Sequence, residues 1–277
     1  MAVVPEDVTT TLAFLKPDPR HEQEKPYRMR YDPGPDIPRT NCETQSQSDI
    51  TIHDIRHVKG DYMLERNGFE VVELKSRLAA EEFYDEEKVK NVWYLELKEM
   101  CKRKYGAKRV EVLEHGIRKR HVQFPISTGD DYEHLQPTSI IHIDFTPESA
   151  LIMSQQGLRV DPSAYNRVQI FNIWKPLHGP LTDWPLTVCD SRTVTPERDC
   201  IATDVVERSG FTENYQVYYH PDMRFCYLSG QRADEVIVFR QTDTEPGCVP
   251  HAGFLNPKTT PGERPRESIE TRVFLYY

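Results

Sequence analysis

The chain has 277 residues, of which 38% are hydrophobic and 29% charged, and its formal net charge is −9. These proportions are typical of a folded protein and exclude a wholly disordered one. The acidic balance argues against a nucleic-acid partner, because such proteins need a basic face to displace counterions from phosphate. No run of 18 or more apolar residues occurs, so we expect no membrane-spanning helix and no membrane partner.

Six cysteines are spread along the chain, and none forms a C-x-x-C pair. A structural zinc knuckle is therefore not expected. The N-terminal residues lack the basic start and apolar core of an export signal, so we expect reduced thiols and a cytoplasmic protein.

Residues 1–50 are rich in proline and charged side chains, and we expect them to form an extended arm over the rest of the protein, with a flexible tail as the alternative. The short apolar stretch Leu12–Leu15 is a candidate edge strand within this arm. Globular patterning starts near Thr51, so residues 51–277 are predicted to form a single domain with helical additions.

The clearest helix is predicted from about Asp85 to Tyr105. Apolar side chains recur there every three or four residues, as in Val89 and Trp93, and form one stripe. Asp85 suits the N-cap position and Gly106 suits the C-terminal stop.

Short β-rich runs follow this helix, broken by Gly, Pro and Asp, and many short strands of this kind are typical of an antiparallel sandwich or a jelly roll. Two short helices are expected to interrupt them, each starting with Thr-Pro-Glu, at Thr146 and at Thr195. The predicted strands are Arg109–Leu113, Ser139–Phe145, Arg167–Trp174, Leu186–Cys189, Tyr215–Tyr219, Phe225–Leu228, Glu235–Gln241 and Thr271–Tyr276.

A His-x-Asp triplet lies within the second of these strands. Alternate side chains on a strand face the same way, so His142 and Asp144 project together. Such a pair can take two adjacent positions on one metal, and a second histidine from a distant strand completes a facial triad with three open positions. That arrangement suits Fe(II). Taken alone, however, the triplet fits a polar strand face equally well.

A second triplet of the same type, from His220 to Asp222, has proline at its centre and is interpreted as a loop pair. The C-terminal region favours His142 and Asp144 instead. His251 is followed 15 positions later (266 − 251) by Arg266 and then by Ser268, a spacing typical of 2-oxoglutarate enzymes. The arginine offers a planar, two-pronged donor to a distal carboxylate, and the serine hydroxyl adds a hydrogen bond.

Several further segments carry a family resemblance from about Thr51 to the C-terminus. The chain resembles the fungal hydroxylase/desaturase family often called AsaB-like, which includes a gibberellin desaturase. The matching segments are Leu64–Glu70, Gly106-Ala107 with Arg109-Val110, His115 with Arg118, His142–Asp144, Arg167–Leu177, Pro185-Leu186 with Cys189-Asp190, Asp234-Glu235, Pro250-His251 with Phe254, and Pro265–Glu270.

This resemblance implies a mainly β protein with flanking helices, folded as a double-stranded β-helix (jelly roll), that uses Fe(II), 2-oxoglutarate and O2. By the same resemblance, the metal ligands would be His142, Asp144 and His251, and the cosubstrate would be held by Arg266 and Ser268.

The chain departs from the family at two places, which would reshape the pocket. Lys175 stands where the family commonly has arginine, and Phe145-Thr146 stands where it favours Gln-Ser. Neither departure touches the predicted metal ligands.

Other residues are candidates for substrate contact, each with a plainer alternative. Asn172 and Trp174 share one strand face and are either pocket residues or part of the core. Arg118, with His115, is either a substrate contact or part of a solvated basic turn. Asp190 either orients a neighbour or closes a turn.

These features predict an oxygenase that hydroxylates, desaturates or cyclises a small molecule in secondary metabolite biosynthesis. Two alternatives stay open. One is a metallohydrolase in which the same triad holds zinc, and the other is a non-catalytic binding protein of the same fold. A homodimer formed through the N-terminal arm is a further hypothesis.

Overall fold

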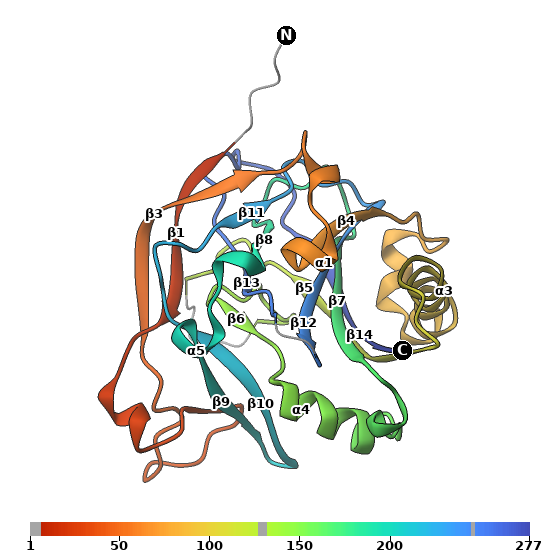
Figure 1. Ribbon diagram of the computed structural model, residues 1–277. Coiled ribbons are helices and arrows are strands. Elements are labelled where there is room, and N and C mark those ends of the chain that lie inside the picture. The colour runs from red at the N-terminus through yellow and green to blue at the C-terminus, as the bar shows by residue number, and fades with distance from the viewer. Residues whose placement is uncertain (1–6, 127–131, 245–246) are drawn as a thin grey trace.

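The computed structural model describes residues 7–126, 132–244 and 247–277. Two β-sheets build the protein, and short helices flank them (Figure 1). The strands are β1 Val8–Leu15, β2 Tyr27–Met29, β3 Thr44–Asp54, β4 Phe69–Glu73, β5 Arg109–Lys119, β6 His142–Ile143, β7 Val168–Pro176, β8 Leu186–Cys189, β9 Cys200–Glu207, β10 Gly210–Val217, β11 Phe225–Tyr227, β12 Glu235–Asp243, β13 His251–Gly253 and β14 Glu267–Tyr276.

The α-helices are short except for the third. They are α1 Leu64–Asn67, α2 Glu86–Lys88, α3 Tyr94–Tyr105, α4 Pro147–Ile152 and α5 Pro196–Asp199. Two π-helical segments, η4 Val89–Trp93 and η5 Met153–Gly157, adjoin α3 and α4. The 3-10 turns are η1 Pro19–Glu22, η2 Lys59–Asp61, η3 Ala80–Tyr84, η6 Pro162–Ala164 and η7 Ser191–Thr193.

The larger sheet has nine strands in the order β1-β3-β11-β8-β13-β6-β10-β9-β2, and the smaller has five in the order β4-β12-β7-β14-β5. Buried side chains from both sheets meet in one cluster, which includes Val188 of β8 and Cys226 of β11 on one side and Trp174 of β7 and Phe239 of β12 on the other. The sheets therefore pack face to face, and the space between them is where inward-facing side chains converge.

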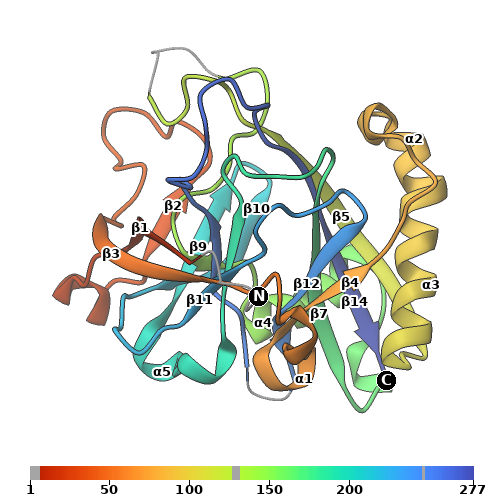
Figure 2. The same ribbon diagram turned by 90° about the horizontal axis from the view of Figure 1, so that it is seen from above.

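Helix α3 covers the outer face of the five-stranded sheet, at the side of the molecule away from β1 and β3 (Figures 1 and 2). Its buried residues Leu97 and Met100 pack with Phe171 and Ile173 of β7. Alternation along β7 thus directs Phe171 and Ile173 to the helix and leaves the even-numbered side chains facing the other sheet.

The helix predicted from Asp85 to Tyr105 is present, as α2, η4 and α3 in direct succession. The Asp85 side chain accepts hydrogen bonds from the backbone N–H groups of Glu87 and Lys88, and Gly106 ends the helix in a left-handed conformation. The π-helical turn at Val89–Trp93 was not predicted, because the four-residue spacing of Val89, Trp93 and Leu97 fits a regular α-helix equally well.

Five strands, β2, β3, β4, β9 and β13, were not predicted from the sequence. Among the predicted segments, two differ markedly from the structure. The strand expected at Ser139–Phe145 shrinks to β6, because it has ladder partners on both sides, β10 and β13, only at His142. Residues 114–119 form no turn, because β5 continues to Lys119 and pairs with β14 over its whole length.

The N-terminal region contributes strands to the larger sheet at both of its edges. Strand β1 is the outermost strand on one side, and β2 is the outermost strand on the other. Strand β3 runs across residue 50, where the sequence suggested a boundary between arm and domain. No helix in the described ranges combines the length and apolar character needed to cross a bilayer.

Candidate functional site

Two histidines lie side by side because β6 and β13 pair at that point. His142 and His251 are direct partners in the ladder, and their ring centroids are 4.5 Å apart. The Nδ1 atom of His142 lies 2.8 Å from the Ile140 carbonyl oxygen, and that of His251 lies 3.3 Å from the Val249 carbonyl oxygen. If each Nδ1–H donates to its carbonyl, the Nε2 lone pair of each ring is left available to a metal.

Asp144 follows β6 directly, and its carboxylate is held from the opposite sheet. One oxygen, Oδ2, accepts hydrogen bonds from Asn172 Nδ2 at 2.6 Å and from Arg272 Nε at 3.1 Å. The other, Oδ1, lies 3.5 Å from His142 Nε2. The Asp144 backbone N–H also donates to Gln241 Oε1 at 2.7 Å. The carboxylate is therefore fixed with one oxygen directed at the histidines.

Ligand atoms of His142, Asp144 and His251 all lie within 4.8 Å of one another. Two imidazoles and one carboxylate are the donor set of non-heme Fe(II) oxygenases. Bound on one side of the metal, they leave the other side open. The sequence prediction had named these three residues, and the fold brings them together. Their role as ligands stays a prediction.

The protonation states in this cluster suit metal binding. Burial and the neighbouring His142 lower the pKa of His251 to about 3, so its ring is neutral at pH 7. Burial alone raises the pKa of Asp144, but the Arg272 guanidinium and the nearby His142 ring hold it well below its usual range. A neutral imidazole and an ionised carboxylate are the forms that coordinate metals.

Arg266 lies immediately before β14 and is only 3% exposed. Its Nε donates to Ser268 Oγ at 3.1 Å and its Nη1 to the Trp184 carbonyl oxygen at 2.9 Å, while Cζ lies 5.2 Å from the Trp174 ring centroid. No ion pair joins it to a carboxylate among the described residues. Burial, with nearby Arg118, lowers its pKa to about 9, which leaves the guanidinium charged at pH 7.

A narrow cavity connects the histidines with Arg266. Its volume is about 20 Å³, which is room for about one water molecule. Accommodating a five-carbon dicarboxylate therefore requires the side chains around it to move apart. The lining includes Arg118, His142, Trp174, His251, Arg266 and Glu270.

Gly253 presses directly against the Arg266 guanidinium. A Cβ at this position would lie 2.8 Å from Arg266 Nη1 and 3.0 Å from Trp184 Cδ1. We expect Gly253→Ala to displace the guanidinium and to raise the 2-oxoglutarate concentration needed for half-maximal turnover by about tenfold, which corresponds to about 1.4 kcal/mol. Gly60→Ala is the matched control, since a Cβ there meets no atom within 4 Å. An unchanged 2-oxoglutarate requirement in the Gly253 variant would contradict the prediction that Arg266 holds the cosubstrate.

The two candidates on β7 lie at the site. Asn172 reaches the Asp144 carboxylate and Trp174 lies beneath Arg266. Asn172 is therefore a hydrogen-bonding neighbour of the three predicted metal ligands rather than an ordinary core residue. Trp174 belongs both to the core between the sheets and to the cavity wall.

Lys175 lies away from the site, which corrects the expectation that it shapes the pocket. Alternation on β7 turns it to the helix side, where its Nζ lies 4.8 Å from the Phe83 ring centroid and 5.4 Å from that of Trp93. Asp190 also lies elsewhere. It closes turn η7 by accepting hydrogen bonds from Arg192, and Asn67 donates to it at 3.0 Å.

The buried position of Lys175 predicts a pH-dependent stability. Burial lowers its pKa from 10.5 to about 8, so at pH 7 the folded state carries a poorly solvated charge. We expect Lys175→Met to raise the free energy of unfolding at pH 7 by about 1–2 kcal/mol, less than the pKa shift alone implies because the two rings stabilise the cation.

The sign of the pH effect follows from the lowered pKa. Above pH 8 the folded protein releases the Lys175 proton while the unfolded chain keeps it until pH 10.5, so wild type gains stability relative to Lys175→Met over this window. Urea unfolding of both proteins at pH 7 and pH 9.5 measures the difference between their free energies of unfolding. Lys102→Met is the control, because Lys102 is exposed. A stability advantage of Lys175→Met over wild type that grows toward pH 9.5 would contradict this prediction.

Arg118 and His115 both lie on β5 but differ in their surroundings. Arg118 is the ladder partner of Ser268 and donates from Nη1 to the Gln136 carbonyl oxygen at 2.7 Å, facing the cavity. The His115 ring contacts Tyr94, with Nδ1 2.8 Å from the hydroxyl oxygen. Arg118 thus remains a candidate substrate contact, whereas His115 joins β5 to helix α3.

Three residues of the site were not assigned from sequence. Arg272 and Gln241 hold Asp144, and Glu270 Oε2 lies 4.0 Å from His251 Nε2. Burial and the nearby Asp144 raise the pKa of Glu270. For Glu270 and Arg272 a signal existed, because they continue the even-numbered face of β14 that starts at Arg266 and Ser268. No comparable pattern marked Gln241.

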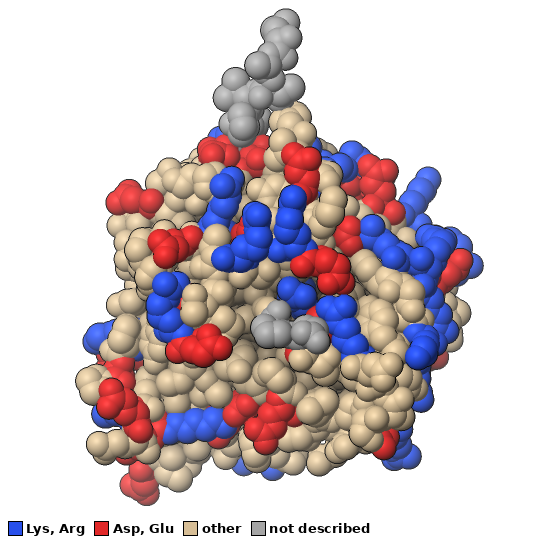
Figure 3. All heavy atoms as spheres, in the orientation of Figure 1, with Lys and Arg blue, Asp and Glu red and all other residues tan. Residues whose placement is uncertain are grey.

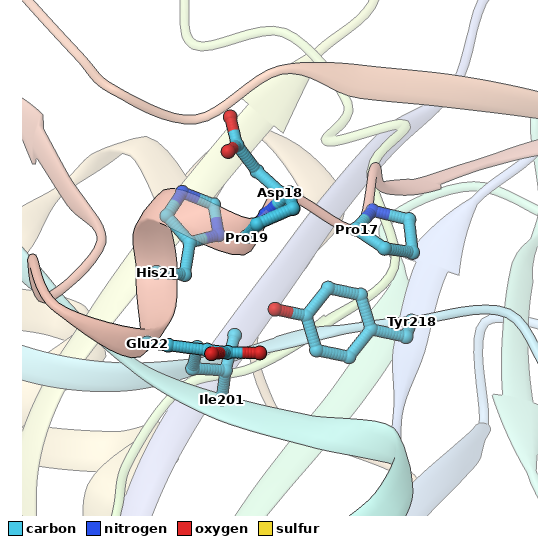
Figure 4. Close-up of a pocket in the computed structure, with 7 residues that line it drawn as sticks. All are labelled: Pro17, Asp18, Pro19, His21, Glu22, Ile201 and Tyr218. Carbon is cyan, nitrogen blue, oxygen red and sulfur yellow. The ribbon is translucent and has the colours of Figure 1, made fainter.

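A separate cavity of about 340 Å³ lies beside turn η1, and Figure 4 shows the side chains that line it. It shares no lining residue with the cavity at the histidines. Its residues are Pro17, Asp18, Pro19, His21, Glu22, Ile201 and Tyr218.

Curated proteins with similar sequences are fungal oxygenases. The Fe(II)/2-oxoglutarate-dependent dioxygenase nvfI of Aspergillus novofumigatus is 27% identical, with 96% of this chain and 95% of the relative covered. The hydroxylase/desaturase efuI of Hormonema carpetanum is 28% identical, with 100% and 97% covered. The alpha-ketoglutarate-dependent dioxygenase tstK of Talaromyces stipitatus is 26% identical, with 82% and 84% covered.

A solved structure shares the fold. The iron and alpha-ketoglutarate-dependent endoperoxidase NvfI superimposes with a TM-score of 0.84 at 24% identity, covering 98% of each chain. The predicted jelly-roll fold and the resemblance to fungal hydroxylase/desaturases are confirmed. The family model described as "Oxidoreductase/YMDC permease-like domain" matches residues 12–276, and the chain belongs to this family.

Proposed function

We propose that the protein is an Fe(II)- and 2-oxoglutarate-dependent oxygenase that oxidises a small molecule in fungal secondary metabolism. One observation carries the proposal. Two histidines, which form a three-residue group with Asp144, line one end of a narrow cavity. The other end holds Arg266, a buried cation with no carboxylate partner among the described residues. The first group fits an iron ion, and the second fits the distal carboxylate of the cosubstrate.

The iron would be held by His142, Asp144 and His251. Bound there with 2-oxoglutarate, it supplies the oxidising chemistry that no side chain can perform, with succinate and CO2 as the products of the cosubstrate. The chain's own residues supply placement. Asn172 and Arg272 hold the Asp144 carboxylate, and the ring of Phe239, 4.7 Å from that of His251, covers the buried side of the cluster.

The cosubstrate would be oriented by Arg266 and Ser268. The Trp184 carbonyl oxygen and the face of Trp174 hold the guanidinium in one orientation before a ligand arrives, while other side chains around the cavity must move to admit the ligand. A preorganised arginine loses little side-chain freedom on binding and therefore discriminates a dicarboxylate from a monocarboxylate. Hydroxylation, desaturation and cyclisation of the substrate are all compatible with this arrangement.

Two other functions remain in view. A zinc hydrolase would use the same three ligands to activate water but has no use for a buried arginine at the far end of the cavity. A non-catalytic binding protein would keep the fold without turnover, yet the donor set and its hydrogen-bonding neighbours are all present. Both alternatives are therefore less well supported.

Anaerobic titration of the Fe(II)-loaded protein with 2-oxoglutarate tests the proposal. We expect the weak visible charge-transfer band of an iron–oxoglutarate chelate to appear and saturate. Succinate, which lacks the keto oxygen needed for chelation, is the matched control and should give no band. Absence of the band, together with tight zinc binding, would favour the hydrolase.

A cytoplasmic location and a homodimer are further proposals. Six free cysteines fit a reducing compartment. Fractionation of the producing cell tests the first proposal, and sedimentation of the purified protein tests the second. The division into an arm of residues 1–50 and a domain of residues 51–277 is testable by deleting the arm and measuring thermal unfolding.

A further inference from the structure

A large cavity adjoins the predicted metal ligands, lined by residues of the N-terminal segment, of β9 and β10, and of the five-stranded sheet. Its volume is about 730 Å³, within the range of small-molecule sites. His142 and Asp144 form part of its wall, so a molecule bound in it would contact the predicted iron position. This inference rests on the proposed function, because it concerns the substrate of that same site.

The charge of this cavity is opposite to that of the whole chain. On the face shown in Figure 3, acidic and basic side chains are interspersed, and the formal net charge is −9. The cavity, in contrast, is lined by five arginines and one carboxylate, that of Asp144. The arginines are Arg28, Arg30, Arg39, Arg118 and Arg272.

Two of these arginines already have acidic partners. Arg272 pairs with Asp144 and Glu114, and Arg30 lies 3.7 Å from Glu207. The remaining three, Arg28, Arg39 and Arg118, form no ion pair with a described carboxylate. Arg39 and Arg118 each donate to a backbone carbonyl, those of Met29 and Gln136. For Arg28 no side-chain hydrogen bond is present among the described residues.

Strand register places Arg28 on the same sheet face as His142. Strand β2 runs parallel to β9, with Arg28 beside Val205, as Figure 2 shows for the two strands. Along β9 and β10 the same face carries Val205, then Thr203 with its partner Asn214, then Gln216. Gln216 is in turn the ladder partner of His142.

The strand order also gives the distance between the strand of His142 and the strand of Arg28. Three strand spacings separate β6 from β2, about 14 Å at the backbone level. An anion held by Arg28 would therefore lie well away from the iron, at the far end of an elongated molecule. The surface between them is mostly polar, since Thr203, Asn214 and Gln216 all line the cavity.

Gln216 points independently to a polar ligand. Its side chain is 5% exposed, and its Oε1 is buried without a hydrogen-bond partner among the described residues. A buried acceptor left unpaired is costly, and a ligand hydroxyl or amide in the cavity would satisfy it.

We infer that the substrate is an elongated carboxylic acid, whose carboxylate is bound by Arg28 and whose far end is presented to the predicted metal ligands His142 and Asp144. Arginine is suited to this role because it holds a carboxylate through two parallel hydrogen bonds. The N-terminal segment therefore completes the substrate site by contributing a specificity-determining residue.

Matched probes that differ only in charge test this inference. The ω-hydroxy derivatives of octanoic, decanoic and dodecanoic acid, whose hydroxyl can donate to Gln216 Oε1, are titrated by calorimetry into the protein loaded with Fe(II) and 2-oxoglutarate without O2, beside the three corresponding primary amides. We expect at least one acid to bind about tenfold more tightly than its amide in wild type. Arg28→Gln should abolish this preference, and Arg28→Lys should retain part of it.

Arg208→Gln is the control, because Arg208 stacks over Tyr31 near the same edge of the sheet but does not line the cavity. It should keep the wild-type preference. The inference is overturned if no acid binds more tightly than its amide in wild type, or if Arg28→Gln keeps the full preference. Calorimetry detects binding whether or not the charge-transfer band forms, so failure of this inference is distinguishable from failure of the proposed function.

Discussion

Replacing Asp144 with alanine is expected to abolish turnover and to weaken Fe(II) binding on the order of a hundredfold or more. The carboxylate is the only anionic member of the three-residue cluster. Its loss also removes the acceptor of the Asn172 amide and one of the two carboxylates that pair with Arg272. His142→Ala should abolish turnover in the same way without leaving a charge unpaired. Iron content after gel filtration and 2-oxoglutarate consumption measure the two effects.

The second His-x-Asp triplet provides a matched control. His220 and Asp222 have the same spacing as His142 and Asp144, and His220 Nδ1 lies 3.3 Å from Asp222 Oδ2. Asp222 is 71% exposed, however, and neither residue belongs to the three-residue cluster. His220→Ala and Asp222→Ala should therefore keep wild-type iron content and turnover. Equal losses at the two triplets would show that the effect is one of folding rather than of metal binding.

Local patterns predicted the elements whose structure is determined locally. The helix that starts after Asp85 has its cap and its apolar stripe within the segment itself. The partnership of His142 and Asp144 follows from two-residue periodicity alone. His251 was identified by its spacing from Arg266 and by family resemblance, and the fold then places it beside His142.

Other features depend on contacts between distant segments, which periodicity does not encode. Strand β6 is short because its neighbours β10 and β13 meet it over few residues. Lys175 faces the helix because the register of β7 with β14 directs Trp174 inward. The interpretation of residues 1–50 as an arm could not place Arg28 in the substrate cavity, because that position follows from the pairing of β2 with β9.

Removing the Arg266 guanidinium should selectively weaken the binding of 2-oxoglutarate. We expect Arg266→Met to raise the 2-oxoglutarate concentration for half-maximal turnover about 30-fold to 4,000-fold, since the loss of one member of a buried charge pair costs about 2–5 kcal/mol. Turnover at saturating 2-oxoglutarate should fall much less, because the iron ligands are untouched. Arg266→Lys should recover only part of the affinity, since an ammonium group cannot form the two parallel hydrogen bonds.

Arg264 is the natural control for this experiment. It lies two residues before Arg266, is 59% exposed and pairs with Glu267 at 3.6 Å, so Arg264→Met should leave the cosubstrate requirement unchanged. The role of Arg266 is decided by comparing two effects of its replacement, the change in the 2-oxoglutarate requirement and the change in maximal rate. An equal loss of maximal rate with no change in requirement would mean that the guanidinium supports the fold around Trp184 instead of binding the cosubstrate. In that case the unpaired buried charge would need a different anion.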